Sequence, residues 1–117
     1  MEDADKALAS LQRKTVLVEG KNDVAALKQL GVDADFVTAT GRNEDVVRKA
    51  AKGQIVLLFD FDGEGRRKEK FFRELLHNEG LSVLDAPRRK IRRAFGTLTI
   101  EELPARYEKM IEEKRDD

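Results

Sequence analysis

Residues 55–65 read Ile-Val-Leu-Leu-Phe-Asp-Phe-Asp-Gly-Glu-Gly, an apolar run that ends in acidic residues and a glycine-rich turn. A short, continuously apolar run is typical of a strand that is buried on both faces of a parallel sheet. The glycines that follow favour a sharp turn into a helix. The stretch therefore predicts a strand over 54–60, with Asp60 and Asp62 at its carboxyl end, where open α/β sheets bind their ligands.

A second stretch, residues 16–23, has the same design and reads Val-Leu-Val-Glu-Gly-Lys-Asn-Asp. Glu19 ends the apolar run, and Asp23 falls in the first turn of the next predicted helix, where it complements the helix dipole. If the two strands are neighbours, Glu19, Asp60 and Asp62 converge at one edge of the sheet. Because close carboxylates repel one another, this arrangement favours a hard divalent cation, with Mg²⁺ as the expected ion and Mn²⁺ as its substitute.

Apolar periodicity predicts strands and helices that alternate along the chain. Strands are expected over 15–19, 35–38, 54–60 and 81–85, and helices over 4–13, 23–30, 43–52, 64–79 and 99–115. This alternation predicts right-handed βαβ units, and so a single Rossmann-like α/β domain over 1–117 with helices on both faces of the sheet. A four-stranded parallel sheet in the order 2-1-3-4 makes the first and third strands neighbours.

Local signals predict the ends and faces of the helices. Asn22 and Asn43 are each expected to cap the helix that follows. In the helix over 64–79, Phe71 and Phe72 are expected to face the core, together with the two leucines that come after them.

Composition excludes several classes of protein. The chain contains no Cys, which excludes disulfides and thiolate metal sites. There is no apolar run near 18 residues and the first residues are acidic, unlike those of a signal peptide, so we expect a cytoplasmic protein with no membrane partner. Charged residues make up 39% of the chain while Asn and Gln total six, a mix typical of thermophile proteins.

Charge is unevenly distributed, although 23 basic and 23 acidic residues give a net charge of zero. Residues 66–93 carry ten basic and four acidic residues and directly follow the second acidic motif. This basic segment is expected to hold a nucleic acid against the metal site, and a solvated helix surface is the alternative. The expected nucleic-acid contacts are Lys21, Arg42, Arg66 and Arg67. Because no aromatic residues alternate with the basic ones, stacking on single-stranded bases is not predicted.

Taken together, the two acidic motifs resemble the signatures of the Toprim domain, the catalytic domain shared by topoisomerases, bacterial primases and some nucleases. The family pattern is a hydrophobic strand that ends in Glu-Gly, then a strand that ends in Asp-x-Asp with a glycine shortly after. Residues 40–42, Thr-Gly-Arg, add a local match. The resemblance spans a core of about 14–86, which leaves a basic stretch and a helix over 87–117. The chain looks most similar to small stand-alone members and to the ribosomal-RNA maturation nuclease group.

This resemblance implies Mg²⁺-dependent chemistry on the phosphodiesters of RNA or DNA, as in a small nuclease or other phosphotransferase. By carry-over, Asp60 and Asp62 are catalytic and bind the metal. Glu19 binds the metal or acts as general acid or base. Asp23 and Glu64 are candidates for a supporting role, through water or by charging a helix N-terminus.

Other interpretations remain open. The main alternative is a non-catalytic Toprim module that binds metal and nucleic acid and acts with a protein partner, since no substrate-recognition domain is evident. Residues 55–63 also resemble the opening motif of haloacid-dehalogenase phosphatases, which normally carry Thr or Val in place of Glu64. A response-regulator receiver would need a paired acid where the chain has Glu19 alone, and a fifth strand. A complete topoisomerase is not expected, because the only tyrosine, Tyr107, lies in the predicted last helix.

Overall fold

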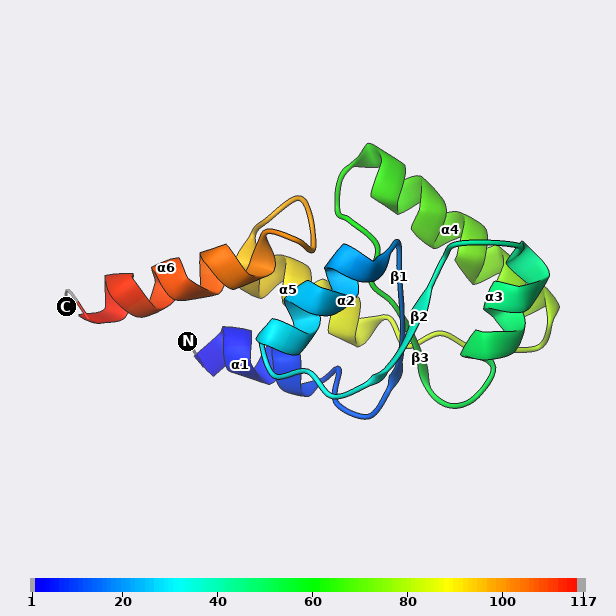
Figure 1. Ribbon diagram of the computed structural model, residues 1–117, viewed down its shortest axis with the longest axis horizontal. Helices are drawn as coiled ribbons and strands as arrows, with labels where there is room; N and C mark the ends of the chain where they lie inside the picture. The colour runs from blue at the N-terminus through cyan, green and yellow to red at the C-terminus, as the bar shows by residue number, and fades with distance from the viewer. Residues whose placement is uncertain (1, 116–117) are drawn as a thin grey trace.

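A computed structural model describes residues 2–115. The elements are α1 (Glu2–Ala9), β1 (Thr15–Val18), α2 (Lys21–Gln29), β2 (Asp35–Thr38), α3 (Asn43–Ala50), β3 (Ile55–Leu57), α4 (Gly63–Asn78), α5 (Ala86–Phe95) and α6 (Leu103–Arg115). The strands form one parallel sheet in the order β2-β1-β3 (Figure 1). The α/β class and the order of the first three strands are thus confirmed. The ends of the predicted domain, residues 1 and 116–117, lie outside the described residues.

The predicted fourth strand, 81–85, is reduced to a single bridge. Val83 pairs in parallel with Ile55, so this segment lies beside β3 as expected. The chain then enters α5 at Ala86, and Pro87 in the first turn of that helix has no N–H to donate to a sheet. The prediction of a four-stranded sheet is therefore wrong, because the helix begins before a second pair can form.

Helices cover both faces of the sheet, and each face has its own apolar core. Val16 and Val18 of β1 pack on one side with α1, α2, α5 and α6, where Ile91 is fully buried. Leu17 points the opposite way and packs with α3 and α4, where Phe72 is 5% exposed. Figure 1 shows these two groups of helices on the left and right of the strands. Burial on both faces explains why β3 is apolar throughout and why β1 is apolar apart from Thr15.

The caps of two helices differ from the prediction. Gly20 precedes α2 as its N-cap, and Asn22 lies inside the helix. Arg42 precedes α3, and Asn43 is the first helical residue. Both helices therefore begin one or two residues earlier than the Asn signals suggest. At neither N-cap does a side chain of that residue accept a hydrogen bond from the helix.

Phe71 does not face the core, which corrects a second prediction. Its side chain is 48% exposed, whereas Phe72 is buried and stacks on Phe59 at 5.5 Å between ring centroids. Adjacent helical residues lie about 100° apart, so α4 can bury only one of two neighbouring rings fully. Phe71 instead packs edge-on against Phe72 at 5.1 Å.

The molecule is elongated, with principal extents of 49 × 26 × 21 Å, and α6 extends away from the sheet (Figure 1). Tyr107 anchors this helix to α1 by donating a 2.7 Å hydrogen bond from its hydroxyl to Asp5. Its ring lies 6.4 Å from that of Phe95. Within residues 2–115, no helix has the length and apolar character needed to cross a membrane.

Candidate functional site

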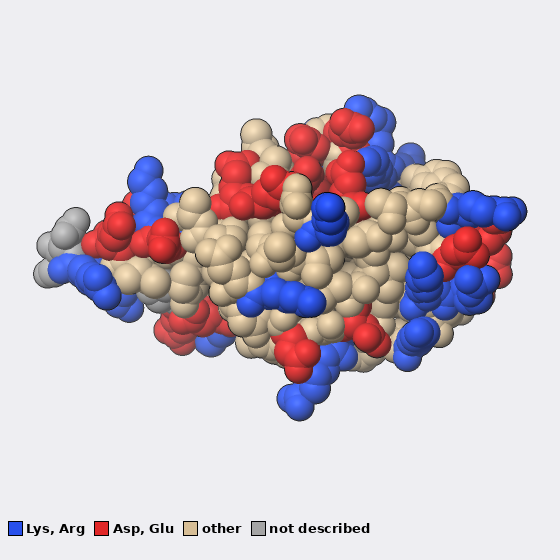
Figure 2. Space-filling view, in the orientation of Figure 1, with Lys and Arg blue, Asp and Glu red and all other residues tan. Residues whose placement is uncertain are grey.

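An acidic pocket lies at the edge of the sheet where the strands end. β1 pairs with β3 in register, Leu17 opposite Leu57, so the residues after both strands meet there. A pocket of about 620 Å³ at this edge is lined by Glu19, Asp23, Asp60 and Glu101, together with Lys21 and two threonines. Figure 2 shows acidic side chains gathered along this edge, above the strands. We call these four carboxylates and the adjacent Asp62 the acidic edge.

Asp60 occupies the centre of the acidic edge. Its Oδ1 accepts a 2.9 Å hydrogen bond from the backbone N–H of Ile100. Burial raises the pKa of Asp60, the Ile100 bond opposes that shift, and the negative charges of Asp62, Glu19 and Glu101 raise it further. The protein therefore holds this carboxylate in surroundings that disfavour its negative charge, which a bound cation would relieve.

Asp62 caps α4. Its Oδ1 accepts a 2.8 Å hydrogen bond from the backbone N–H of Gly65, as an N-cap residue does. This bond also fixes the side chain two residues beyond Asp60. Asp62 is not among the residues that line the pocket, but its charge contributes to the raised pKa of Asp60.

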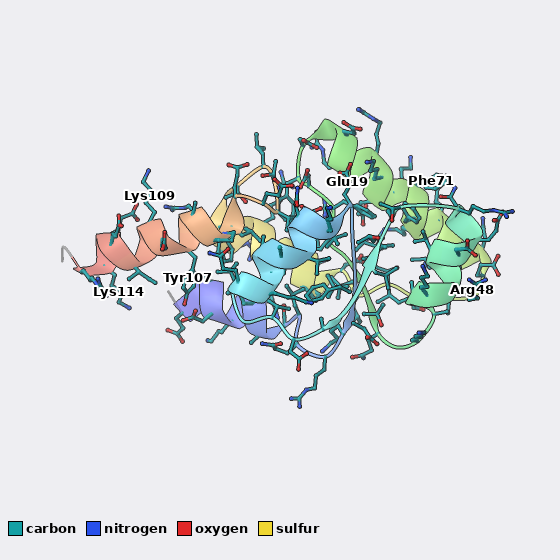
Figure 3. All side chains as sticks on the ribbon, viewed as in Figure 1. Glu19, Arg48, Phe71, Tyr107, Lys109 and Lys114 are labelled. Carbon is teal, nitrogen blue, oxygen red and sulfur yellow. The ribbon has the colours of Figure 1, made fainter. Side chains whose placement is uncertain are left out.

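Glu19 is held by a cation from another element. Its Oε1 lies 2.5 Å from Nζ of Lys68, in the second turn of α4. Figure 3 shows Glu19 at the end of β1, beside α4. The hydrogen bond to Glu19 raises the pKa of Lys68. The chain therefore supplies its own positive charge to one carboxylate of the acidic edge.

Asp23 is the most buried acid of the group, at 7% exposure. Its Oδ2 accepts a 3.1 Å hydrogen bond from the backbone N–H of Gly20, which closes the first turn of α2. Burial raises the pKa of Asp23, the Gly20 bond lowers it, and the charges of Asp60, Glu101 and Glu19 raise it. Asp23 thus shapes the turn after β1 and adds to the negative potential of the pocket.

The carboxylates share one pattern of hydrogen bonding. One carboxylate oxygen accepts a hydrogen bond from the protein in each of four residues, Glu19, Asp23, Asp60 and Asp62. The second oxygen of each has no protein donor within the part of the chain that the structure describes. No three acidic or His side chains among residues 2–115 are grouped as a metal cluster. The donor set nevertheless fits Mg²⁺ in kind, since this ion often takes only one or two carboxylates and fills its other positions with water and substrate phosphate.

The loop after β3 is tightly packed. A Cβ added to Gly65 would lie 2.0 Å from the carbonyl oxygen of Asp60, so only glycine fits. On the other side of the loop, the guanidinium of Arg88 donates to the carbonyl oxygens of Phe59 and Asp60, the latter at 3.0 Å. Burial lowers the pKa of Arg88. Arg88 thus connects α5 to the backbone of the loop after β3.

The remaining predicted residues lie in different places. Lys21 lines the acidic pocket, as expected for a phosphate contact. Arg42 is exposed and pairs with Glu44 at 3.4 Å, outside the pocket lining. Arg66 lines a separate cleft between α4 and α5. The other two, Arg67 and Glu64, are exposed on the first turns of α4.

Glu101 is a pocket residue that the sequence did not single out. It lies just before α6 and far from both acidic motifs in the chain. The neighbouring Ile100 brings it to the site through the bond to Asp60. An acidic pair at 101–102 was the only available signal, and such pairs are common on solvated surfaces.

Comparison with known proteins gives relatives and a shared fold. No family model matches the chain. The chain is similar to two UPF0292 proteins. MJ1624 from Methanocaldococcus jannaschii is 35% identical over 77 residues, which cover 62% of this chain and 59% of that protein. TV1259 from Thermoplasma volcanium is 28% identical over 105 residues, 85% of this chain and 87% of that protein.

A solved structure of a protein from Aquifex aeolicus superposes on this chain with a TM-score of 0.70 and 28% identity. The match covers 84% of this chain and 95% of the Aquifex chain, so it includes most of the fold. The names of these three proteins state no activity. The chemistry of the acidic edge must therefore carry any argument about function.

Proposed function

We propose that this protein performs Mg²⁺-dependent phosphodiester chemistry on nucleic acid, as a small Toprim nuclease. The observation that carries the proposal is the acidic edge itself, where Glu19 directly follows β1 and Asp60 lies three residues beyond the neighbouring β3, around one pocket. Burial raises the pKa of Asp60, and the charges of the surrounding carboxylates raise it further. Perturbed acids that line a pocket are typical of functional sites.

Two of the carboxylates would hold the ion. Asp60 and Asp62 follow one strand and keep an oxygen each that no described protein group occupies. Bound there, Mg²⁺ would neutralise phosphate oxygens and activate water. Asp23, which is already bonded to Gly20, would act only indirectly.

The chain's own residues would handle protons and charge. Across the pocket, Glu19 would act as a further metal ligand or as a general acid or base, and the ammonium of Lys68 keeps it oriented. Lys21, also in the pocket lining, would neutralise a phosphate of the substrate.

A non-catalytic module that binds metal and nucleic acid is the second candidate. The ion pair between Lys68 and Glu19 favours it, because an internal cation already neutralises one of the proposed ligands. In that case a protein partner would supply the missing catalytic or recognition groups.

Cleavage assays distinguish the two functions. Labelled DNA and structured RNA are incubated with the protein and Mg²⁺ or Mn²⁺. The parent is compared with the site variants Glu19→Gln and Asp62→Asn. The control is Glu74→Gln, at an exposed position of α4. A nuclease predicts metal-dependent cleavage that both site variants lose and the control keeps. Absence of cleavage with tight nucleic-acid binding would support the module, and cleavage that survives in both site variants would contradict the site.

A further inference from the structure

A second charged feature lies between α4 and α5, away from the acidic pocket. It is a cleft of about 650 Å³ whose lining includes six basic residues and only two acidic ones. The basic residues are Arg66, Lys70 and Arg73 on α4 and Arg88, Arg89 and Arg92 on α5. The two helices pack on opposite faces of the sheet, so the cleft runs along the outer edge beyond β3. We call it the basic cleft.

Two of its cations are already engaged by the protein. Arg73 forms ion pairs with both acidic residues of the cleft, Glu69 and Asp85. The guanidinium of Arg88 is bonded to backbone carbonyls of the β3–α4 loop. These contacts join α4 to α5 and stabilise the walls of the cleft.

Four cations remain available to a ligand. Arg66, Lys70, Arg89 and Arg92 are exposed and form no ion pair within residues 2–115. Since Arg73 has already paired with both acidic side chains, the cleft has a strong excess of positive charge. Four like charges lining one cleft repel one another, so a bound polyanion would relieve a cost that the folded chain carries.

The position of the cleft indicates which polyanion fits. Arg88 in the cleft donates to the carbonyl of Asp60, whose side chain faces the acidic pocket. The basic cleft and the acidic edge are therefore opposite sides of one loop. A nucleic-acid strand with one phosphate at the acidic edge carries further phosphates every few ångströms, which would reach the cleft.

The cleft is suited to phosphates rather than bases. Its one aromatic residue, Phe61, is 4% exposed and is covered by Arg88, with 4.7 Å from the guanidinium carbon to the ring centroid. A base therefore has no free ring to stack on. Phosphate contacts from exposed Arg and Lys side chains orient a strand without reading its sequence.

We propose that the basic cleft binds backbone phosphates of a nucleic-acid strand that also crosses the acidic edge. The choice of nucleic acid over an acidic protein rests on the proposed function, whereas the anion site rests on the cleft alone. Binding in the cleft needs no metal and is independent of sequence. It follows that the structure separates two tasks, phosphate holding at the cleft and metal chemistry at the edge.

The test is the salt dependence of binding, measured by fluorescence anisotropy with labelled duplex DNA and RNA in EDTA. Arg89→Gln/Arg92→Gln and Arg66→Gln/Lys70→Gln each remove two cleft cations. The matched control is Lys90→Gln/Arg93→Gln, which removes two charges from the same helix where it borders a groove against α1. The binding constant falls as salt rises, so the slope of its logarithm against log salt is negative. If both residues contact phosphates, each cleft double variant should reduce the magnitude of this slope by about 2, and the control should leave it unchanged.

Several outcomes overturn the proposal. Equal slopes for all three double variants would mean that the protein responds to net charge and not to the cleft. Binding of poly-glutamate with the same affinity would identify a general site for acidic ligands. A lack of measurable nucleic-acid binding would also refute it. The binding assays contain no metal and are therefore independent of the cleavage assays. A smaller salt dependence for the cleft variants, together with no cleavage by the parent in Mg²⁺, supports the cleft and contradicts the nuclease. Cleavage by the parent in Mg²⁺, with slopes that the cleft variants leave unchanged, supports the nuclease and overturns the cleft.

Discussion

The backbone N–H of Ile100 donates a 2.9 Å hydrogen bond to Oδ1 of Asp60, forty residues earlier in the chain. Nearby, the N–H of Phe61 donates to the carbonyl of Leu98 at 2.7 Å. These two bonds connect the α5–α6 loop to the loop after β3. They fix the orientation of Asp60 and bring Glu101 to the pocket. Through Glu101, the α5–α6 loop therefore contributes a carboxylate to the acidic edge.

Replacing Asp60 by Asn should stabilise the metal-free protein at neutral pH. Because the pKa of Asp60 is raised by folding, its ionisation favours the unfolded chain, and stability is lost as pH rises through the folded pKa. Asn keeps an oxygen for Ile100 and does not ionise. In urea unfolding, the advantage of Asp60→Asn over the parent should therefore be smallest below about pH 3.9 and grow toward pH 7.

Mg²⁺ provides the control for this prediction. The ion should stabilise the parent at pH 7, in proportion to its occupancy, and have little effect on Asp60→Asn. A stability difference that does not change with pH would contradict the repulsion argument. Equal stabilisation of both proteins by Mg²⁺ would contradict the assignment of Asp60 as a ligand.

Gly65→Ala should destabilise the fold on the order of 1–3 kcal/mol, because the added methyl group must displace the loop. The added Cβ would lie 2.0 Å from the Asp60 carbonyl oxygen, a backbone atom that cannot rotate away. Gly63→Ala, two residues earlier, is the control, since its Cβ would meet only the end of the Arg67 side chain at 3.6 Å. Thermal unfolding of both variants tests the difference, and equal melting temperatures would contradict the packing argument.

Lys68→Gln should bind Mg²⁺ more tightly than the parent, by up to about tenfold. The change removes both a competitor for Glu19 Oε1 and a positive charge near the ion. Titration calorimetry measures the affinity, with Lys70→Gln as a control that removes the same charge two residues along α4. Weaker binding by Lys68→Gln would show instead that Lys68 holds Glu19 in the position that the metal needs.

Arg88→Lys should cost about 1–3 kcal/mol of stability, although it keeps the charge. A single ammonium cannot reproduce the fork of bonds from Arg88 to the carbonyls of Phe59 and Asp60. Arg89→Lys, at the exposed neighbouring position, should change stability by less than about 0.5 kcal/mol. Denaturant unfolding checks both values. A tolerated Arg88→Lys would mean that those carbonyls do not depend on the guanidinium.

The elements with strong local patterns were predictable. The apolar runs before Glu19 and Asp60 became adjacent parallel strands, and Gly-rich residues 63–65 began α4. The segment over 81–85 has an apolar pattern too, yet α5 starts so early that only Val83 pairs. Periodicity reports which residues can be buried, but it does not report where a neighbouring helix will begin.

By itself, the sequence determined that Glu19 and Asp60 follow the apolar runs of the first and third strands, because a strand buried on both faces is apolar. Only the tertiary structure decided what those carboxylates contact. The bonds from Lys68 to Glu19 and from Ile100 to Asp60 join residues 49 and 40 positions apart. The split of the basic residues between a cleft and other surfaces depends on how α5 packs against the sheet edge. Such long-range contacts follow from the packing of whole elements, and no local pattern encodes them.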